Sequence, residues 1–373
     1  MKKHLPLATP HMSDEGYELQ YIHDAFSKNW IAPLGENVNE FEKALGTYMA
    51  AGYPVALSSG TAALHLSMIL AGVKAGDKVF CQSLTFAASV NPVTYLGAEP
   101  VFIDSDYETW NMDPDALERA FRIHGVPKAV VVVHLYGTPA RMDRIVEICR
   151  KHNVPLIEDA AEALGSEFRG RKCGTFGKFG ILSFNGNKII TTSGGGMLLC
   201  EDQADAKHAL KLATQAREPF PWYQHEEIGF NYRMSNVVAG VGRGQAKILP
   251  LRVQQKRAIF DRYTANLADL PIRFQPEAEG TLANRWLTSI VVEEGCGVTP
   301  ARLLDALAAD TIEGRHLWKP MHVQPVFAGT AFVTAGESSV SEDLFARGLC
   351  LPSDTKMSME DVDRVCDVIR KEF

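Results

Sequence analysis

Lys188 is the residue whose surroundings in the sequence most favour chemistry at a side chain. It lies in SFNGNKIITTSGGGML (183–198) and closely follows the apolar strand expected at FGILSFN (179–185). An amine beside low-dielectric walls becomes a nucleophile more readily than a solvated one. The glycines that follow let neighbouring backbone approach closely. A solvated lysine on a turn is the alternative interpretation.

A carboxylate and a helix start supply two further groups that could bind a ligand. Asp159 ends an apolar strand in PLIEDAAEALGS (155–166), where it either serves a ligand site or caps the next helix. Ser58, Ser59, Gly60 and Thr61 lead directly into an apolar helix. Free N–H groups at a helix start bind anions, although ordinary capping by serine or threonine explains the same residues.

Together these groups predict a site for pyridoxal 5′-phosphate (PLP). The helix start would hold the phosphate, Asp159 would keep a proton on the ring nitrogen, and Lys188 would form a Schiff base with the aldehyde. The sequence contains neither GxxxxGK(S/T) nor GxGxxG. It therefore indicates neither a nucleoside triphosphate site nor a dinucleotide site.

Strand-like and helix-like segments alternate through the first part of the chain. Helices are predicted at 60–73, 86–97, 113–122 and 142–153. Strands are predicted at 77–83, 99–106, 128–137 and 154–161. The alternation predicts a parallel sheet covered by helices on both faces, with ligands bound beyond the carboxyl ends of its strands. Polar residues gather at those ends, namely Gln82 to Phe86, Asp104, His134, Glu158 and Asp159.

The character of the sequence changes after about residue 245. A long connecting helix is predicted at 249–270, followed by a strand at 285–294 and helices at 299–310 and 358–373. We therefore expect a large ligand-binding domain at 1–245 and a smaller C-terminal domain at 246–373.

Composition excludes several classes of partner. The 373 residues carry a net charge of 38 − 45 = −7, and no segment concentrates Lys and Arg. This argues against a nucleic-acid or anionic-membrane partner. Seven scattered cysteines show no CxxC pair or metal-like cluster and are expected to be reduced, mostly core thiols. No run approaches the ~20 apolar residues of a membrane span, and no long apolar stretch follows the two lysines of MKKHLPLATPHM, so we expect no signal peptide and a cytoplasmic protein without a metal.

Seven segments, in order and spacing, resemble the fold-type I, PLP-dependent nucleotide-sugar aminotransferases of the DegT type. They are NWIAPLGENVNEFEKAL, ALSSGTAALHLSM, SLTFAASVNPVTYLGAEPVFID, LIEDAAEALGS, FGILSFNGNKIITTSGGGML, GFNYRMSNVVAGVGRGQ and HLWKPMH. The resemblance implies an α/β fold with a mainly parallel, seven-stranded-type sheet and a smaller α+β C-terminal domain. It is greatest to the branch that aminates C4 of UDP-4-keto-6-deoxy-N-acetylglucosamine, as in bacillosamine-type glycan biosynthesis.

The resemblance also implies a role for each matching residue. Lys188 would be the Schiff-base lysine and proton shuttle, and Asp159 would pair with the pyridinium nitrogen. Asn231 would reach the phosphate of a partner subunit, so that a homodimer shares its active sites and a monomer is inactive. The other cofactor contacts implied are Ser59, Gly60, Thr61, Phe86, Glu162, Ser183 and Asn185.

A second set of residues would surround the nucleotide sugar or the amino donor, L-glutamate. The set comprises Trp30, Ile31, Pro33, Leu34, Gly35, Glu162, Asn187, Arg233, Trp318 and His322. Core packing for Phe86, Trp318 and His322, and an ion pair for Arg233, are the alternatives. Two positions depart from the family pattern: Ser193 replaces an expected glycine, and His316 replaces a proline found in many relatives.

Rival functions remain at this stage. Some relatives are dehydratases with histidine in place of the lysine, so Lys188 favours transamination. A dTDP- or GDP-linked ketosugar, or amination at C3, is a rival substrate choice. A PLP-binding regulatory protein without turnover would carry a DNA-binding module, and the sequence has no basic recognition helix.

Overall fold

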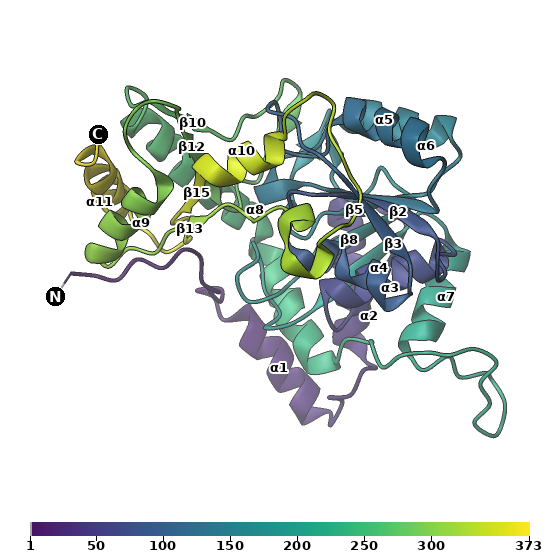
Figure 1. The fold of residues 1–373 in the computed structure, drawn as a ribbon. Coiled ribbons are helices and arrows are strands. Elements are labelled where there is room, and N and C mark those ends of the chain that lie inside the picture. The colour runs from purple at the N-terminus through teal and green to yellow at the C-terminus, as the bar shows by residue number, and fades with distance from the viewer. Residues whose placement is uncertain (1) are drawn as a thin grey trace.

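An eight-stranded sheet forms the centre of the fold in the computed structural model, which describes residues 2–373 (Figure 1). Strand β9 runs antiparallel to both of its neighbours, and the other neighbouring strands are parallel. The prediction of a mainly parallel sheet is confirmed. In spatial order the strands are β1 (Tyr53–Leu57), β9 (Gly196–Cys200), β8 (Phe179–Ser183), β5 (Leu156–Asp159), β4 (Ala129–Val133), β2 (Lys78–Gln82), β3 (Glu99–Ile103) and β14 (Phe332–Val333).

Helices cover both faces of this sheet because the strands are apolar on both sides. In β2, Val79 and Cys81 belong to one buried cluster and Phe80 to the cluster on the opposite face. One face is covered by α3 (Gly60–Leu70), α4 (Asn91–Tyr95) and α7 (Gln203–Ala213). Across the sheet lie α5 (Pro114–His124) and α6 (Met142–Lys151), with α2 (Glu36–Met49) and part of α8 (Asn236–Asn266) packed beside them.

A smaller, four-stranded antiparallel sheet forms the centre of the C-terminal part. Its order is β10 (Ile272–Phe274), β12 (Thr288–Val292), β15 (Gly348–Leu351) and β13 (Arg315–His316). Helices α9 (Pro300–Ala309) and α11 (Met359–Arg370) pack on it. Helix α10 (Val340–Arg347) leads directly into β15. The α+β character expected of this region is observed.

Helix α8 joins the two sheets. Its first half packs against α1 (Tyr17–Ser27) and α2, while Ile259 and Tyr263 belong to the core of the small sheet. The predicted boundary at residues 245 and 246 falls inside this continuous helix. Two segments also cross the boundary, because Leu5 packs in the small-sheet core and Val333 in the core of the large sheet.

Two predicted helices differ from the structure. Segment 86–97 forms a 3₁₀ turn, η1 (Ala87–Ser89), and then the short α4. Pro92, the second residue of α4, explains the break, since proline fits the first turn of a helix but not its interior. The helix predicted at 249–270 begins earlier, at Asn236, where the Ser235 side chain accepts a hydrogen bond from the Val238 N–H.

Short elements complete the chain. A three-stranded sheet contains β11 (Thr281–Leu282), β6 (Glu167–Phe168) and β7 (Arg171–Lys172). Three further 3₁₀ turns are η2 (Leu135–Gly137), η3 (Met321–Val323) and η4 (Pro325–Phe327). Within residues 2–373, helix length and apolarity do not reach what a membrane crossing requires. All seven cysteines in this range are free thiols, and six of them are buried.

Candidate active site

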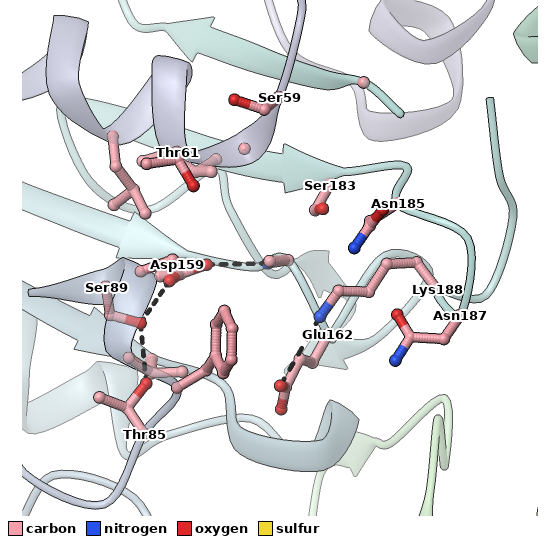
Figure 2. A pocket seen from close by; sticks show the side chains of 18 of the residues that line it. Ser59, Thr61, Thr85, Ser89, Asp159, Glu162, Ser183, Asn185, Asn187 and Lys188 are labelled. Atoms are coloured by element: carbon pink, nitrogen blue, oxygen red, sulfur yellow. Dashed lines mark hydrogen bonds and ion pairs between the residues drawn. The ribbon is translucent and has the colours of Figure 1, made fainter. Parts of the chain in front are cut away.

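An open cavity lies beyond the carboxyl ends of β4, β5 and β8, beside the start of α3. Its empty volume is about 950 Å³. Most of the residues that the sequence singles out line it: Ser59, Gly60, Thr61, Phe86, Asp159, Glu162, Ser183, Asn185, Asn187, Lys188 and Trp318. The topology therefore brings these distant segments to one place, as Figure 2 shows.

The start of α3 provides the anion-binding end of the cavity. The Ser59 hydroxyl accepts the Ala62 N–H at 3.0 Å, which leaves the first amides of the helix, at Gly60 and Thr61, directed out of the helix end. A Cβ on Gly60 would lie 3.1 Å from Ser183 Cβ. The missing side chain lets the helix start approach the end of β8 closely.

Gly196, the last glycine of the run after Lys188, serves the same close packing. A Cβ on Gly196 would lie 2.3 Å from the Gly60 nitrogen, so this contact requires glycine. Ser193, where the family pattern has glycine, has φ = 73°, in the left-handed region that favours glycine. The expectation that these turns admit close backbone approach is confirmed at Gly196.

Asp159 occupies the end of β5 and is nearly completely buried. One carboxylate oxygen accepts the Ala161 N–H at 3.1 Å, and the other accepts the Ser89 hydroxyl at 2.7 Å. Thr85 Oγ1 lies 2.8 Å from Ser89 Oγ. The carboxylate is therefore held by two direct hydrogen bonds, one of them supported by Thr85, while it still lines the cavity.

Lys188 faces Asp159 across the cavity (Figure 2). The Lys188 Nζ lies 3.7 Å from Glu162 Oε1 and 4.2 Å from the centre of the Trp286 ring. Burial raises the pKa of the Glu162 carboxyl, and the opposing effects of the Lys188 charge and the Tyr136 N–H do not cancel it. An amine and a carboxylate with restricted access to water thus form a pair in the cavity wall.

Three polar residues at strand ends have structural partners and lie outside the cavity, contrary to the pattern expected from the sequence. Asp104 accepts hydrogen bonds from the Val340 and Ser341 N–H groups and so anchors the start of α10. His134 Nε2 lies 3.0 Å from Glu158 Oε2. Glu158 also accepts the Gly174 and Gly177 N–H groups, so this pair fastens the 174–177 turn.

Part of the predicted substrate set lies outside this cavity. Arg233 is paired with Glu42 and the Ala56 carbonyl. His322 bonds Ser83 Oγ through Nδ1 and Glu342 through Nε2, so both ring nitrogens have partners. The remaining members of this set outside the cavity lining are Trp30, Ile31, Pro33, Leu34 and Gly35. Asn231, predicted to reach the phosphate of a partner subunit, also lies outside the lining of this chain's cavity.

Other lining residues had no role assigned from the sequence. Thr85 and Ser89 lie in SLTFAAS, directly after β2, and their position at a strand end was the available signal. Trp286 comes from the C-terminal part of the chain, more than ninety residues after Lys188, and nothing local marks it. Only the folded chain brings it to the cavity.

Comparison with known proteins assigns this geometry to a family. Residues 13–370 match the DegT/DnrJ/EryC1/StrS aminotransferase family. The chain belongs to this family. The prediction of an aminotransferase is therefore confirmed at the level of the family, over nearly the whole length of the chain.

The alignments with individual relatives span almost the whole of this chain and of each relative. EpsN of Bacillus subtilis (strain 168), whose name describes a candidate pyridoxal phosphate-dependent aminotransferase, is 51% identical over 99% of this chain and 96% of its own. GDP-perosamine synthase of Escherichia coli O157:H7 is 35% identical, covering 99% and 98%. The crystal structure of the aminotransferase TlmJ from Streptoalloteichus hindustanus has a TM-score of 0.90 at 28% identity, covering 99% of both chains.

The residues of this aminotransferase fit PLP, its cofactor. Side chains are missing at Gly60 and Gly196, where the helix start meets β8 and β9. Phe86 lines the cavity yet leaves 51% of its surface exposed, which offers a flat apolar face to an aromatic ring. Asp159 and Lys188 supply the carboxylate and the amine on opposite sides. Within residues 2–373 no His, Cys, Asp and Glu cluster could hold a metal ion.

Proposed function

We propose that this aminotransferase transfers an amino group from L-glutamate to a nucleotide-linked 4-ketosugar, UDP-4-keto-6-deoxy-N-acetylglucosamine. The products would be 2-oxoglutarate and the 4-amino-4,6-dideoxy sugar nucleotide. The observation that carries the proposal is the arrangement of Lys188 and Asp159 on opposite sides of one cavity, with the start of α3 at its edge.

The cofactor would be held at three points. Gly60, Thr61 and Ser183 would bind the phosphate, since free amides and a hydroxyl meet there. Asp159 would accept a hydrogen bond from the protonated ring nitrogen and so keep the proton there, and Phe86 would cover one face of the ring. When bound, PLP supplies an aldehyde that exchanges between amines and a ring that accepts electrons from the substrate carbon.

The protein's own groups would then move protons and exclude water. The Lys188 Nζ would take the proton from the α-carbon of glutamate and return it at the later step. Glu162 would stabilise the positive charge that this transfer places on Nζ, because its carboxylate lies 3.7 Å away. Phe86 and Trp318, whose ring centres are 5.2 Å apart, would shield the reacting carbon from water.

A sugar nucleotide is supported by the cavity and by the relatives. The indole N–H of Trp318 is buried on the cavity wall beside the Glu162 carboxyl, and within residues 2–373 it makes no hydrogen bond of good geometry. A ligand hydroxyl or carbonyl would supply an acceptor. GDP-perosamine synthase is named for a GDP-linked sugar. The UDP choice rests on the seven motif segments, and a dTDP- or GDP-linked ketosugar, or amination at C3, is the alternative.

A homodimer in the cytoplasm is part of the proposal. Asn231 is exposed and lies outside this chain's own cavity lining, as a residue destined for a partner's phosphate site would. Trp222, Tyr223 and Ile228, in the segment after α7 that extends from the body of the fold, are also exposed (Figure 1). A second copy of the chain would cover such apolar side chains.

A product assay tests the proposal. The purified protein loaded with PLP is incubated with L-glutamate and, in parallel, with the 4-ketosugars linked to UDP, dTDP or GDP, and the aminated product is identified by mass and by NMR. Efficient turnover of the UDP-linked sugar supports the proposal. Faster turnover of a dTDP- or GDP-linked sugar would change the substrate assignment to that nucleotide. A protein that captures PLP and aminates none of these sugars would contradict the nucleotide-sugar assignment.

A further inference from the structure

Trp286 places an aromatic face directly against the Lys188 amine. The Lys188 Nζ lies 4.2 Å from the centre of the ring, and only 1% of Trp286 is exposed. A cation at this distance over an indole face is attracted by the ring's negative quadrupole, most strongly where water is excluded. The Glu162 carboxylate approaches the same Nζ at 3.7 Å. Two groups of different chemistry thus favour a positive charge at one point.

The ring is fixed by hydrogen bonds at each end of the residue. The Trp286 indole N–H donates to the Asn187 carbonyl at 2.7 Å, which ties it to the turn that carries Lys188. The Trp286 backbone N–H donates to Asn284 Oδ1 at 2.8 Å, and its carbonyl accepts the Lys256 Nζ at 3.0 Å. Tyr136 stacks on the ring with centres 6.4 Å apart and planes 19° apart. A ring held this firmly has one defined position.

Other charged or titratable groups lie around this amine. Asp159 and Glu162 line the main cavity, and Tyr136 donates its backbone N–H to Glu162 Oε2. Behind Lys188 a second, smaller cavity is lined by Lys188 itself together with His11, Arg252 and Lys256. Among these groups Arg252 opposes a positive charge on Nζ, while His11 Nε2 lies 2.6 Å from the Asp354 carboxylate, which offsets its effect. Trp286 and Glu162 are the groups in direct contact with Nζ that favour the charge.

We propose that Trp286 is a residue of the catalytic site, whose ring stabilises the positive charge that forms on the Lys188 Nζ. This inference rests on the proposed function, in which Nζ takes a proton from the amino donor. The ring is neutral, so it stabilises the ammonium without competing for its proton. Electrostatic groups positioned where charge develops are the largest contributors to many enzymatic rates.

The first test measures covalent capture of PLP, in which the neutral Nζ joins the aldehyde carbon and water leaves. The rate is followed by the visible absorption band between about pH 6 and pH 10. In Trp286→Leu the pH of half-maximal capture rate should fall by about one unit, since a desolvated cation–π contact contributes the equivalent of a tenfold change. Trp286→Phe keeps a ring and should shift it by less than about half a unit. Glu162→Gln removes the other contact and should also lower it.

A second measurement separates this role from damage to the fold. In a Lys188→Ala background PLP binds without covalent capture, and adding Trp286→Leu should change its dissociation constant by less than about twofold. The glutamate half-reaction of Trp286→Leu at neutral pH should slow about tenfold with little change in glutamate affinity. Damage to the fold slows capture at every pH and leaves the midpoint unchanged.

The outcomes are distinct from those of the proposed function. An unchanged midpoint in Trp286→Leu, or equal loss of PLP affinity with and without Lys188, would overturn the role of Trp286. A wild-type protein that captures PLP but aminates no sugar nucleotide would contradict the substrate assignment, while the midpoint comparison would still stand. A wild-type protein that captures no PLP would contradict both.

Discussion

Ser89 Oγ donates a hydrogen bond of 2.7 Å to Asp159 Oδ2, and this contact joins the segment after β2 to the end of β5. Thr85 Oγ1 lies 2.8 Å from the same hydroxyl. Both hydroxyl-bearing residues are buried. A carboxylate that must meet a ring nitrogen at a fixed angle needs such support, because its own side chain rotates about two bonds.

Ser89→Ala should lower kcat/KM for the glutamate half-reaction by roughly tenfold. A hydrogen bond to a charged group contributes about 1.5–3 kcal/mol, and part of it is regained from water or rearrangement. Thr85→Val is the matched control, since it removes the next hydroxyl and leaves the Ser89 contact, and its effect should be about threefold. Stopped-flow absorbance gives both values. Equal rates for Ser89→Ala and wild type would show that Ala161 alone positions Asp159.

Asp159→Asn should still capture PLP, because the Lys188 amine is unchanged. Its glutamate half-reaction should fall by about 10²–10³-fold, since an amide does not hold the proton on the ring nitrogen. Single-turnover absorbance measures the decrease in this rate. Lys188→Ala is the control for covalent capture, since it should show no absorption band of captured cofactor. A half-reaction within tenfold of wild type would remove Asp159 from its assigned role.

Gly196→Ala should disturb the phosphate end of the site. The added Cβ would lie 2.3 Å from the Gly60 nitrogen, so backbone must move, at a cost of about 1–3 kcal/mol in unfolding free energy. The matched control is Gly194→Ala, whose Cβ would meet no described atom within 4 Å. Urea unfolding and PLP titration follow both variants. If both variants lose equal stability, the close approach at Gly196 is not the cause.

Sequence patterns succeeded where a residue's role follows from its own segment. Lys188 and Asp159 each end or follow an apolar strand, and Gly60 begins an apolar helix, so topology places them together once the sheet is parallel. Predictions failed where a distant partner decides. The Asp104 carboxylate accepts a hydrogen bond at the start of α10, more than two hundred residues later. The Glu158 carboxylate accepts one from the 174–177 turn, in a separate segment.

The same reason explains what the sequence missed. Trp286 contacts Lys188 only in the folded chain. Helix α8 leads to the small sheet at β10, and the segment after β11 then returns to the cavity. Its neighbour Arg285 has φ = 55°, a backbone conformation that no propensity predicts for arginine. The break at Pro92 could have been anticipated, since proline within a helical pattern marks a break. The early start of α8 could not, because three glycines within 236–248 weaken its helical pattern.

The last prediction concerns the buried Lys256, which supports Trp286 from behind. Burial lowers the pKa of its ammonium to about 7, with Arg252 acting in the same direction and Asp354 opposing it. Its Nζ donates to the carbonyls of Trp286 and Ser353, and a neutral amine has two N–H donors for those two acceptors.

Because the folded-state pKa of Lys256 lies below its unfolded value, the unfolded chain binds more protons between about pH 7 and pH 10. The penalty for burying this group is therefore complete below about pH 7, and stability rises through that window by at most roughly 1.4 kcal/mol per pH unit. Lys256→Met should remove this component from the pH dependence, whatever its effect on absolute stability. Urea unfolding at several pH values compares the two slopes, with the exposed Lys207→Met as the control for losing one lysine. If stability changes with pH equally in wild type and Lys256→Met, Lys256 stays charged in the folded protein, and the Trp286 carbonyl accepts its hydrogen bond from an ammonium group.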